Sequence, residues 1–568
     1  MTDLVIRNGT VIDGTGADPV EADIAIAGGK ITQVGRVSAR GAEEIDAKGR
    51  IVTPGFVDPH SHYDAQVTWS NRITPSSWNG VTTTLIGNCG VGFAPCRPTE
   101  RDLLVKLMEG VEDIPEVVLT EGLPWNWQSF PDYLDSLAAR PFDLDVATQV
   151  PHAALRVYVM GQRGVDREPA TPADSAAMAR LAAEGIQAGA LGFSTSRTIN
   201  HKTKAGELIP TLQAEEDELA TIARALHDID LGWLQVISDF DEADSEFAML
   251  RRLTATAGRP MAITILQRDN KPEEWRRITG WIAEAHRQGV EMYGQVLTRP
   301  TGIILGFEIS QNPFTGRPSY EAVAHLPFAQ KIAALRDPAL RARILAETCS
   351  DPSLARRVSR WDRIFPMSDP PNYEPAPEDS VAALAQRMGR DPADLAYDLL
   401  LANDGRTLMY RPLSNYTYGD LGSVRDMLTH DATIIGLGDG GAHVGILCDA
   451  SAISTMLTHW TRDRTRGPKV PLPWAVRRIT ADSARAIGLR DRGVIAPGYK
   501  ADLNVIDYDH LQLTVPQVVY DLPSGGRRLI QRATGYDATI VSGVPVYRNG
   551  EATGALPGRL VRGAQAAP

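Results

Sequence analysis

Two histidines at the end of an apolar run have the spacing that points most directly to chemistry. Residues 53–58 read as a short apolar strand, and His60 and His62 follow it. Because alternate residues of a strand point to one face, both imidazoles should face the same side. Neutral imidazole is a common zinc ligand, so the pair indicates a metal site. The alternative is a chance pair on the surface, which the preceding Pro54-Gly55 and the position at the strand end disfavour.

Asp439 ends a second apolar run, which covers residues 433–438. If this run is the last strand of a closed barrel, it lies beside the first strand, and Asp439 faces His60 and His62. A carboxylate there can ligate a metal and accept a proton from water, so Asp439 is the predicted catalytic base. For this segment alone, an Asp that caps a helix is an equal alternative. His443 is predicted to contact substrate, and a loop-capping role is its equal alternative.

A cysteine follows a third strand, residues 81–86, in the sequence Asn88-Cys89-Gly90. A thiolate beside a divalent cation loses its proton and becomes a ligand. A lone cysteine is more often a small buried residue, and the residues alone favour that alternative for Cys89. The four cysteines of the chain lack the spacing of a disulfide framework.

Five further polar residues are candidates for substrate contact. His152 follows one predicted strand, and Arg268 and Arg299 follow two others. An arginine there can hold a substrate carboxylate through two hydrogen bonds, although a solvated arginine is the common alternative. Asn415 and Tyr416 precede the last strand and are predicted to reach the pocket from its outer side.

Eight predicted strands position these residues and alternate with helical patterns, which predicts a closed parallel (β/α)8 TIM-like barrel. The strand centres lie near Val57, Leu85, Val146, Phe193, Val236, Ile263, Gln295 and Ile435. Active sites of such barrels lie where the strands end, and His60, His62, Cys89 and Asp439 all follow strands. Residues 300–425 are too many for a βα loop and are predicted to form a lid-like insertion over the barrel mouth.

The two ends of the chain share a different texture, with short alternating strands and glycine-containing turns. This likeness predicts a small β-sandwich domain built from residues 1–53 and 490–568. The hydrolase barrel, residues 54–489, is then inserted between its two halves.

Composition restricts the partners. The chain has 568 residues and a net charge of −12, which disfavours nucleic acid as the main partner. No apolar run approaches the length of a membrane span, and the first residues lack the pattern of a signal peptide. We therefore expect a cytoplasmic protein that acts on a small molecule, with no membrane partner. Its oligomeric state is not indicated.

The motifs together resemble those of the amidohydrolase superfamily. The shared features are the strand that ends in His60 and His62, the late Asp439, the split β domain and the glycine-containing segment 493–503. Within the superfamily, Asn88-Cys89-Gly90 and the long insertion resemble the N-acyl-D-amino-acid deacylase (D-aminoacylase) family. The resemblance implies that Cys89 ligates zinc and that the activity is metal-dependent hydrolysis of a linear amide, with an N-acyl-(D-)amino acid as the type substrate. A cyclic amide, a carbamate or an ester would suit the same machinery.

The chain departs from that family at two strands. The family carries a histidine at the end of strands five and six, where this chain has Ser238, Asp239 and Gln267. No lysine that could bridge two metals follows strand four, residues 192–197. The sequence therefore predicts one zinc ion rather than two, and it leaves open whether one of these residues takes a histidine's place. A non-catalytic barrel with a degraded metal site is a second alternative. The presence of all four candidate ligands, His60, His62, Cys89 and Asp439, argues against it.

Overall fold

Eight parallel strands form a barrel at the centre of the molecule, and the order around it is β16-β12-β11-β10-β9-β8-β7-β6. The computed structural model describes residues 2–568. The barrel strands are β6 (Phe56–Asp58), β7 (Val81–Ile86), β8 (Asp145–Pro151), β9 (Gly192–Arg197), β10 (Leu234–Ser238), β11 (Met261–Thr264), β12 (Met292–Val296) and β16 (Thr433–Ile435). All eight coincide with the strands expected from the sequence, so the predicted barrel fold is confirmed.

The first and last barrel strands meet at their carboxyl ends. Asp439 donates its backbone N–H to the carbonyl oxygen of His60 at 3.1 Å, and His62 donates to that of Gly440 at 2.8 Å. The barrel is therefore nearly closed, and the loops after β6 and β16 lie side by side. This closure brings residues almost 400 positions apart in the chain into one site.

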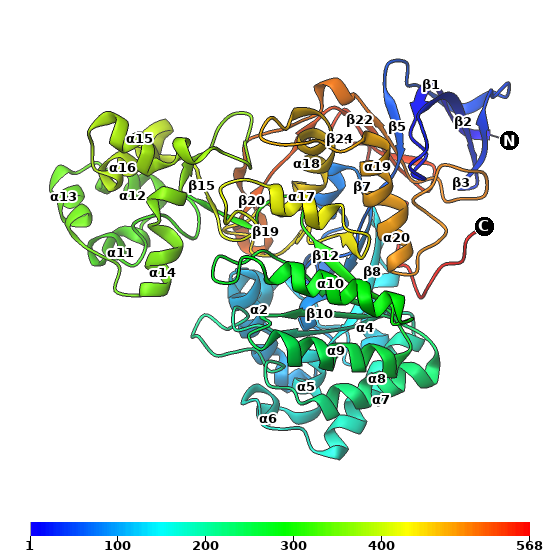
Figure 1. Ribbon diagram of the computed structural model, residues 1–568, viewed down its shortest axis with the longest axis horizontal. Coiled ribbons are helices and arrows are strands. Elements are labelled where there is room, and N and C mark those ends of the chain that lie inside the picture. Colours follow the sequence, from blue (N-terminus) through cyan, green and yellow to red (C-terminus); the bar gives the residue numbers. More distant parts are fainter. Residues whose placement is uncertain (1) are drawn as a thin grey trace.

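Amphipathic helices cover the outside of the barrel, among them α7 (Pro172–Gln187), α8 (Glu216–Ile229), α9 (Ala243–Ala257) and α10 (Glu274–Arg287) (Figure 1). The start of α7 shows how the sequence sets these boundaries. Thr171 accepts a hydrogen bond from the backbone of Asp174, Asp174 bonds back to Thr171, and Pro172 occupies the first helical position. This reciprocal capping satisfies backbone N–H groups that have no partner inside the helix.

A nine-stranded sheet combines the two ends of the chain, as predicted. From the first end come β1 (Thr2–Val11), β2 (Val20–Ala27), β3 (Lys30–Gly35), β4 (Gly41–Asp46) and β5 (Ile51–Pro54). From the other end come β17 (Leu503–Ile506), β22 (Tyr536–Val541), β23 (Val544–Arg548) and β24 (Glu551–Ala552). The halves join where β5 pairs antiparallel with β17, Pro54 opposite Leu503.

Two segments of the C-terminal part of the chain lie outside this nine-stranded sheet. The hairpin of β19 (Gln517–Leu522) and β20 (Gly526–Ile530) pairs separately and reaches the loop after β16, where Leu529 donates to the carbonyl of Val444 at 2.7 Å. Residues 558–565 run along the amino ends of the barrel strands, and Val561 donates to the carbonyl of Val146 at 2.7 Å. The domain limits given from the sequence stay a prediction.

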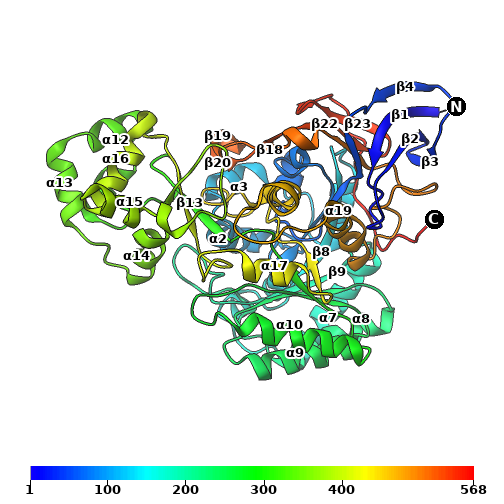
Figure 2. The same ribbon diagram turned by 45° about the horizontal axis from the view of Figure 1, so that its top comes forward.

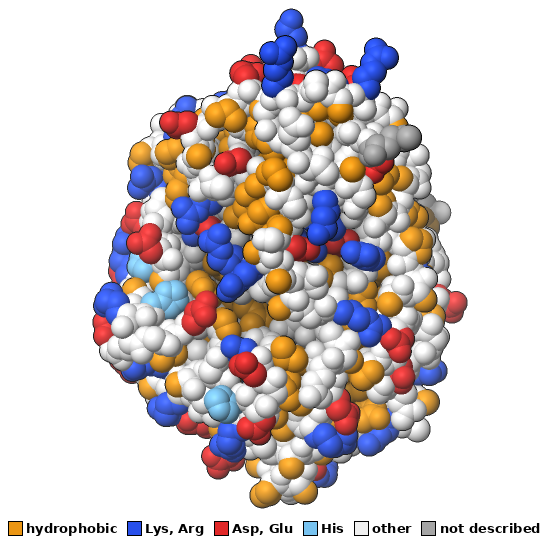
Figure 3. Space-filling model, turned by 90° about the vertical axis from the view of Figure 1, so that its right-hand side faces the viewer, with side chains coloured by type: hydrophobic (Ala, Val, Ile, Leu, Met, Phe, Trp, Pro, Cys, Tyr) orange, Lys and Arg blue, Asp and Glu red, His pale blue; other side chains and the backbone are white. Residues whose placement is uncertain are grey.

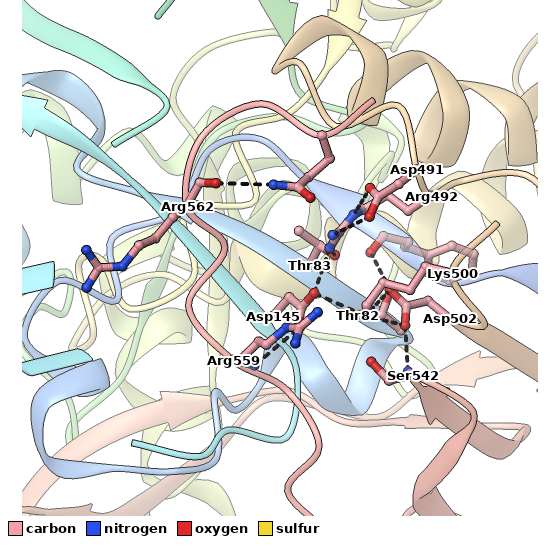
Figure 4. A network of polar contacts seen from close by, with 12 residues as sticks. Thr82, Thr83, Asp145, Asp491, Arg492, Lys500, Asp502, Ser542, Arg559 and Arg562 are labelled. Atoms are coloured by element: carbon pink, nitrogen blue, oxygen red, sulfur yellow. Dashed lines mark hydrogen bonds and ion pairs between the residues drawn. The ribbon is translucent and has the colours of Figure 1, made fainter. Parts of the chain in front are cut away.

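A buried ion network fastens the terminal sheet to the barrel (Figure 4). Asp145, at the start of β8, lies 2.7 Å from Arg492 and 3.0 Å from Lys500. Lys500 also pairs with Asp502, the residue before β17, at 2.6 Å. Burial raises the pKa of Asp145, but the positive charges of Lys500 and Arg492 outweigh it and lower the pKa to about 2. Lys500 and Asp502 belong to the glycine-containing segment 493–503, so this segment carries part of the joint between the barrel and the terminal sheet.

The insertion before β16 forms a helical lobe. Its helices are α11 (Pro318–Ala324), α12 (Phe328–Leu335), α13 (Pro338–Ala346), α14 (Pro352–Val358), α15 (Val381–Met388) and α16 (Pro392–Gly405). They surround a separate apolar core that includes Phe307, Phe314 and Tyr397. The lobe stands on a small sheet of β13 (Gly302–Leu305), β15 (Met409–Pro412) and β14 (Phe365–Pro366). It extends to the side of the barrel in both views (Figures 1 and 2).

The root of the lobe contacts the barrel mouth even though its helices project sideways. Ile304 donates to the carbonyl of Ile446 at 2.8 Å, and Ser310 donates to that of Gly445 at 3.2 Å. Both carbonyls belong to the loop after β16. The lobe therefore holds one rim of the mouth, and its role as a lid stays a prediction.

The surface around the two ends mixes acidic and basic side chains without a large region of one sign (Figure 3). No helix within residues 2–568 combines the length and the apolar character needed to cross a membrane.

Candidate metal centre

Three predicted ligands form a tight group at the mouth. Atoms of His60, His62 and Cys89 that can bind a metal all lie within 4.8 Å of one another. His60 Nε2 is 3.3 Å from Cys89 Sγ. Gly87 lies two residues before Cys89 and has φ 77°. It packs against the backbone of Gln149 so closely that a side chain at this position would clash. The glycine thus lets the chain turn sharply and return the thiol to the barrel axis.

Asp439 lies beside this group. Its Oδ1 is 3.4 Å from His60 Nε2 and 3.8 Å from His62 Nε2. Its side chain is 19% exposed, whereas that of His60 is 1% exposed. Gly438 allows the loop to pass Asp58, whose carboxylate would clash with any side chain at that position. The four residues predicted as ligands are therefore brought together, and solvent reaches them from the Asp439 side.

Burial governs the protonation of this cluster in the absence of a cation. It lowers the pKa of His60 to about 4 and that of His62 further, so both imidazoles are neutral near pH 7. Burial raises the pKa of Cys89, and the negative charge of Asp439 raises it further. Burial also raises the pKa of Asp439, with a smaller contribution from Asp449. A divalent cation acts in the opposite direction, because it favours thiolate and carboxylate.

The donor set fits a divalent metal ion. His62 Nδ1 and Asp439 Oδ1 are buried atoms with no hydrogen-bond partner. Asp439 forms no ion pair with Lys or Arg in the described part of the chain. Two imidazoles, one thiolate and one carboxylate are the ligand types that zinc takes in tetrahedral sites.

Glutamines from alternate barrel strands support the ligands from below. Gln295 on β12 accepts a hydrogen bond from His60 Nδ1 at 2.9 Å, which directs His60 Nε2 toward Cys89 and Asp439. Gln235 on β10 accepts the backbone N–H of Cys89 at 2.7 Å. Such supporting contacts fix the orientation of metal ligands.

His201 lies near the site, and the sequence analysis missed it. It stands in the loop between β9 and α8, and its Nδ1 is 2.8 Å from the Ser196 hydroxyl. Burial lowers its pKa to about 3, and the neighbouring His443 and His60 add to that shift. The sequence signal was slight, since His201 follows a strand without a motif.

His443, a predicted substrate contact, faces the same region. Its backbone has φ 47°, so the loop turns at this residue. Burial lowers the pKa of His443 to about 4, and the positive charge of Arg357 contributes. Arg357 belongs to the last turn of α14, so one helix of the lobe is close enough to act on the mouth.

Two predicted substrate contacts are committed to buried interactions instead. His152 is fully buried, with Nε2 2.7 Å from Glu218 and Nδ1 2.9 Å from Thr195. Arg299 is 1% exposed and pairs with Asp449 at 2.8 Å. Both side chains have their polar atoms occupied, and the structure does not bring them into the cluster.

The remaining candidates also serve the fold. Arg268 pairs with Glu274 at 2.5 Å. Asn415 Oδ1 accepts the backbone N–H of Gln267 at 2.7 Å, while its Nδ2 is buried without a partner. The hydroxyl of Tyr416 donates to the carbonyl of Pro375. None of these contacts joins Arg268, Asn415 or Tyr416 to the residues of the metal cluster.

The residues at the ends of strands five and six do not replace the missing histidines. Ser238 donates to Glu246 at 2.9 Å, and Asp239 accepts the hydroxyl of Thr198 at 2.6 Å. Gln267 donates to the Ser423 hydroxyl at 2.9 Å. Their polar atoms are thus used by neighbouring loops and helices.

A family comparison agrees with this geometry. The family model described as the amidohydrolase family matches residues 43–547, a span that contains all four predicted ligands. The chain belongs to the amidohydrolase family. As a member, it is a metal-dependent hydrolase of carbon–nitrogen bonds other than peptide bonds.

Individual relatives of this amidohydrolase match along almost their whole length. The D-aminoacylase of Alcaligenes xylosoxydans xylosoxydans is 27% identical over 98% of this chain and 97% of that relative. A solved D-aminoacylase with a binuclear metal centre superposes with a TM-score of 0.66 at 23% identity, covering 99% of this chain and 100% of the other. The N-acyl-D-glutamate deacylase of Bordetella bronchiseptica, solved with zinc and a phosphonate inhibitor, gives 0.65 at 24%, covering 99% of each chain. The likeness to these two structures establishes the shared fold.

Proposed function

We propose that this amidohydrolase hydrolyses the amide bond of an N-acyl amino acid, with the D series as the type substrate, and that it holds one zinc ion. The observation that carries the proposal is the convergence of His60, His62, Cys89 and Asp439 at the barrel mouth. The names of the similar proteins, D-aminoacylase and N-acyl-D-glutamate deacylase, support the substrate class.

Asp439 is the proposed catalytic base. A bound zinc ion supplies Lewis-acid chemistry, polarising the substrate carbonyl and making water more acidic. Asp439 takes the proton of the attacking water and passes it to the leaving nitrogen, so that a carboxylate and a free amine result. Its side chain is 19% exposed, more than those of His60 and His62, which supports an approach of substrate and water from its side.

Three residues near the histidines of the cluster suit an N-acyl amino acid as substrate. His201 and His443 are neutral near pH 7, because burial lowers their pKa values to about 3 and about 4, and they can hydrogen-bond the substrate. The side chain of Arg357 is half-buried and forms neither an ion pair nor a hydrogen bond within residues 2–568. We assign its free guanidinium to the substrate carboxylate.

One zinc follows from the residues that are available. Ser238, Asp239 and Gln267 are bonded elsewhere, so strands five and six offer no ligands for a second ion of the binuclear type. Cys89 is the thiolate ligand in this proposal.

The test combines metal analysis with a substrate panel. We expect about one zinc per chain in purified protein. We also expect amine release from one or more N-acetyl-D-amino acids, lost on chelation and restored by zinc. The L enantiomers, a hydantoin, a carbamate and an ester complete the panel and test the alternative substrates. Protein without stoichiometric metal or hydrolysis would contradict the proposal and favour a non-catalytic barrel.

A further inference from the structure

His201 is held on the barrel wall beside the turn that carries Cys89. Ser196 is the second-last residue of β9 and is fully buried, and its hydroxyl oxygen lies 2.8 Å from His201 Nδ1. Two residues earlier on the same strand, Ser194 accepts the backbone N–H of Gly90 at 2.9 Å. Because alternate residues of a strand share a face, Ser196 lies on the side of β9 that contacts this turn, one step nearer the barrel mouth.

A helix holds the other side of the loop that carries His201. This helix is α2 (Arg101–Glu112), and its Gly110 packs so closely on the backbone of Lys202 that a side chain at Gly110 would clash. Two residues later α2 ends, and the carboxylate of its last residue lies 3.2 Å from His62 Nδ1. His201 is therefore fixed between two parts of the structure that both contact the metal cluster.

The hydrogen bond with Ser196 decides which ring nitrogen of neutral His201 carries the proton. Within residues 2–568 the Ser196 hydroxyl has no hydrogen-bond partner other than His201 Nδ1. If Nδ1 donated to Ser196, the buried hydroxyl proton would be left without an acceptor, which is costly. Ser196 therefore donates to Nδ1, and the ring proton lies on Nε2. Nε2 faces away from Ser196 and forms no hydrogen bond in the described part of the chain, so its N–H is free to donate.

We propose that His201 Nε2 donates a hydrogen bond to the amide carbonyl oxygen of the substrate, and that Ser196 is the positioning residue that fixes the required tautomer. The inference rests on the proposed function. When water adds to the carbonyl carbon, negative charge develops on this oxygen, and a donor that is already oriented stabilises it. The proton stays on His201 throughout, while the proton of the water goes to Asp439. The substrate carboxylate remains assigned to Arg357, so the two ends of the substrate have separate partners.

The first test measures the tautomer and does not depend on activity. Nitrogen NMR of the metal-free, full-length protein with isotope-labelled histidine distinguishes a protonated ring nitrogen from an unprotonated one. The signals that are missing from His201→Ala identify those of His201. We expect the proton on Nε2 in wild type, and both tautomers in Ser196→Ala, because that variant lacks the hydroxyl donor. A proton on Nδ1 in wild type would overturn the inference.

The second test separates kcat from KM. His201→Ala should lower kcat by about 10²–10³-fold, the usual effect of removing one donor to an oxyanion. KM and zinc content should change little, because the charge that His201 stabilises develops only after water adds. Ser196→Ala should lower kcat by about tenfold, the worth of one hydrogen bond. A phosphonate analogue of the substrate carries a negative oxygen in place of the carbonyl, so its affinity for His201→Ala should fall in parallel with kcat.

Thr198→Ala is the matched control for Ser196→Ala. Thr198 lies between Ser196 and His201 in the chain, and its hydroxyl donates to Asp239 at 2.6 Å and not to the imidazole. The control should keep the wild-type tautomer and kcat. An equal fall of kcat in both variants would contradict the inference, because it would mean that anchoring of the loop and not the tautomer matters. A rise of KM in His201→Ala without a fall of kcat would also contradict it, because that result makes His201 a ground-state contact.

Failure of this inference is distinct from failure of the proposed function. If wild type neither binds metal nor hydrolyses an N-acyl amino acid, the proposed function fails and the role of His201 fails with it. If wild type is active and His201→Ala keeps its kcat, the proposed function stands and only the roles of Ser196 and His201 are withdrawn.

Discussion

Asp439 has two proposed roles, metal ligand and catalytic base, which a single substitution separates. It lies 3.4 Å from His60 Nε2 and is 19% exposed, so it can bind a metal and meet water. Asp439→Asn keeps the shape and one oxygen ligand but removes the base. We expect it to retain the fold and most of the metal while kcat falls by about 10²–10⁴-fold. The measurement is kcat and zinc content on one preparation.

The paired change His60→Ala with His62→Ala is the comparison for that experiment. It removes two nitrogen ligands, so it should lose the metal itself. Turnover by Asp439→Asn near the wild-type rate would show that another group takes the proton.

Residue types and strand ends predicted the positions of His60, His62 and Asp439, because each follows a strand whose direction fixes where its side chain points. For Cys89 the residues alone favoured a small buried residue, and only the family resemblance implied a ligand. The structure gives two of the predicted substrate contacts, His152 and Arg299, buried partners. Each has a buried acidic partner far along the chain, Glu218 and Asp449, and no local pattern reveals such pairs.

Among the elements, the joint between β8 and the terminal sheet invites a stability test. Asp145 is 1% exposed and faces Arg492 and Lys500. Asp145→Asn leaves two buried cations short of a partner, which should lower the free energy of unfolding by about 3 kcal/mol. Asp491→Asn removes a 26% exposed partner of the same Arg492 and should cost under about 1 kcal/mol. Urea unfolding of both variants checks the difference, and equal losses would contradict a buried joint.

The same joint should show a defined pH dependence. The folded pKa of Asp145, about 2, is below its ordinary value of 3.8. Its stabilising contribution is therefore complete above about pH 4 and is lost as the pH falls toward 2. We expect the stability gap between metal-free wild type and metal-free Asp145→Asn to narrow across that window. A gap that stays constant from pH 5 to 2 would show that the charge of Asp145 is not its source.

Element prediction succeeded where hydrophobic periodicity is strong and failed where partners are distant. The barrel strands are short runs rich in apolar and β-branched residues, and all eight were found. The three-stranded sheet under the lobe was not, because β13 and β15 are separated by more than 100 residues and β14 has two. The helices of the lobe begin at ordinary caps, such as Asp337, Asp351 and Asp391, but the sequence analysis predicted only a lid-like insertion there and not its helices.

At the scale of the whole molecule, we predict that the helical lobe contributes to substrate binding at the barrel mouth through Arg357. Arg357 is the lobe residue whose charge acts on His443. Arg357→Ala should raise KM for a substrate with a free carboxylate by about tenfold or more, since a hydrogen bond to a charged group is lost, while metal content stays the same. A substrate analogue with a carboxamide in place of the carboxylate should not distinguish the variant from wild type. Arg356→Ala, its exposed neighbour, is the control, and an effect equal to that of Arg357→Ala would argue against a specific contact.

The pairing of β5 with β17 has a consequence for how the chain is made. Pro54 meets Leu503, about 450 residues later, so at a synthesis rate of about 5–20 residues per second the edge of β5 waits roughly 20–90 s for its partner. During that time the first five strands offer an unpaired hydrogen-bonding edge while the barrel emerges and folds. The nascent protein therefore depends on something to cover that edge, a chaperone or the growing barrel itself, and slow translation between residues 54 and 503 prolongs its exposure to other chains.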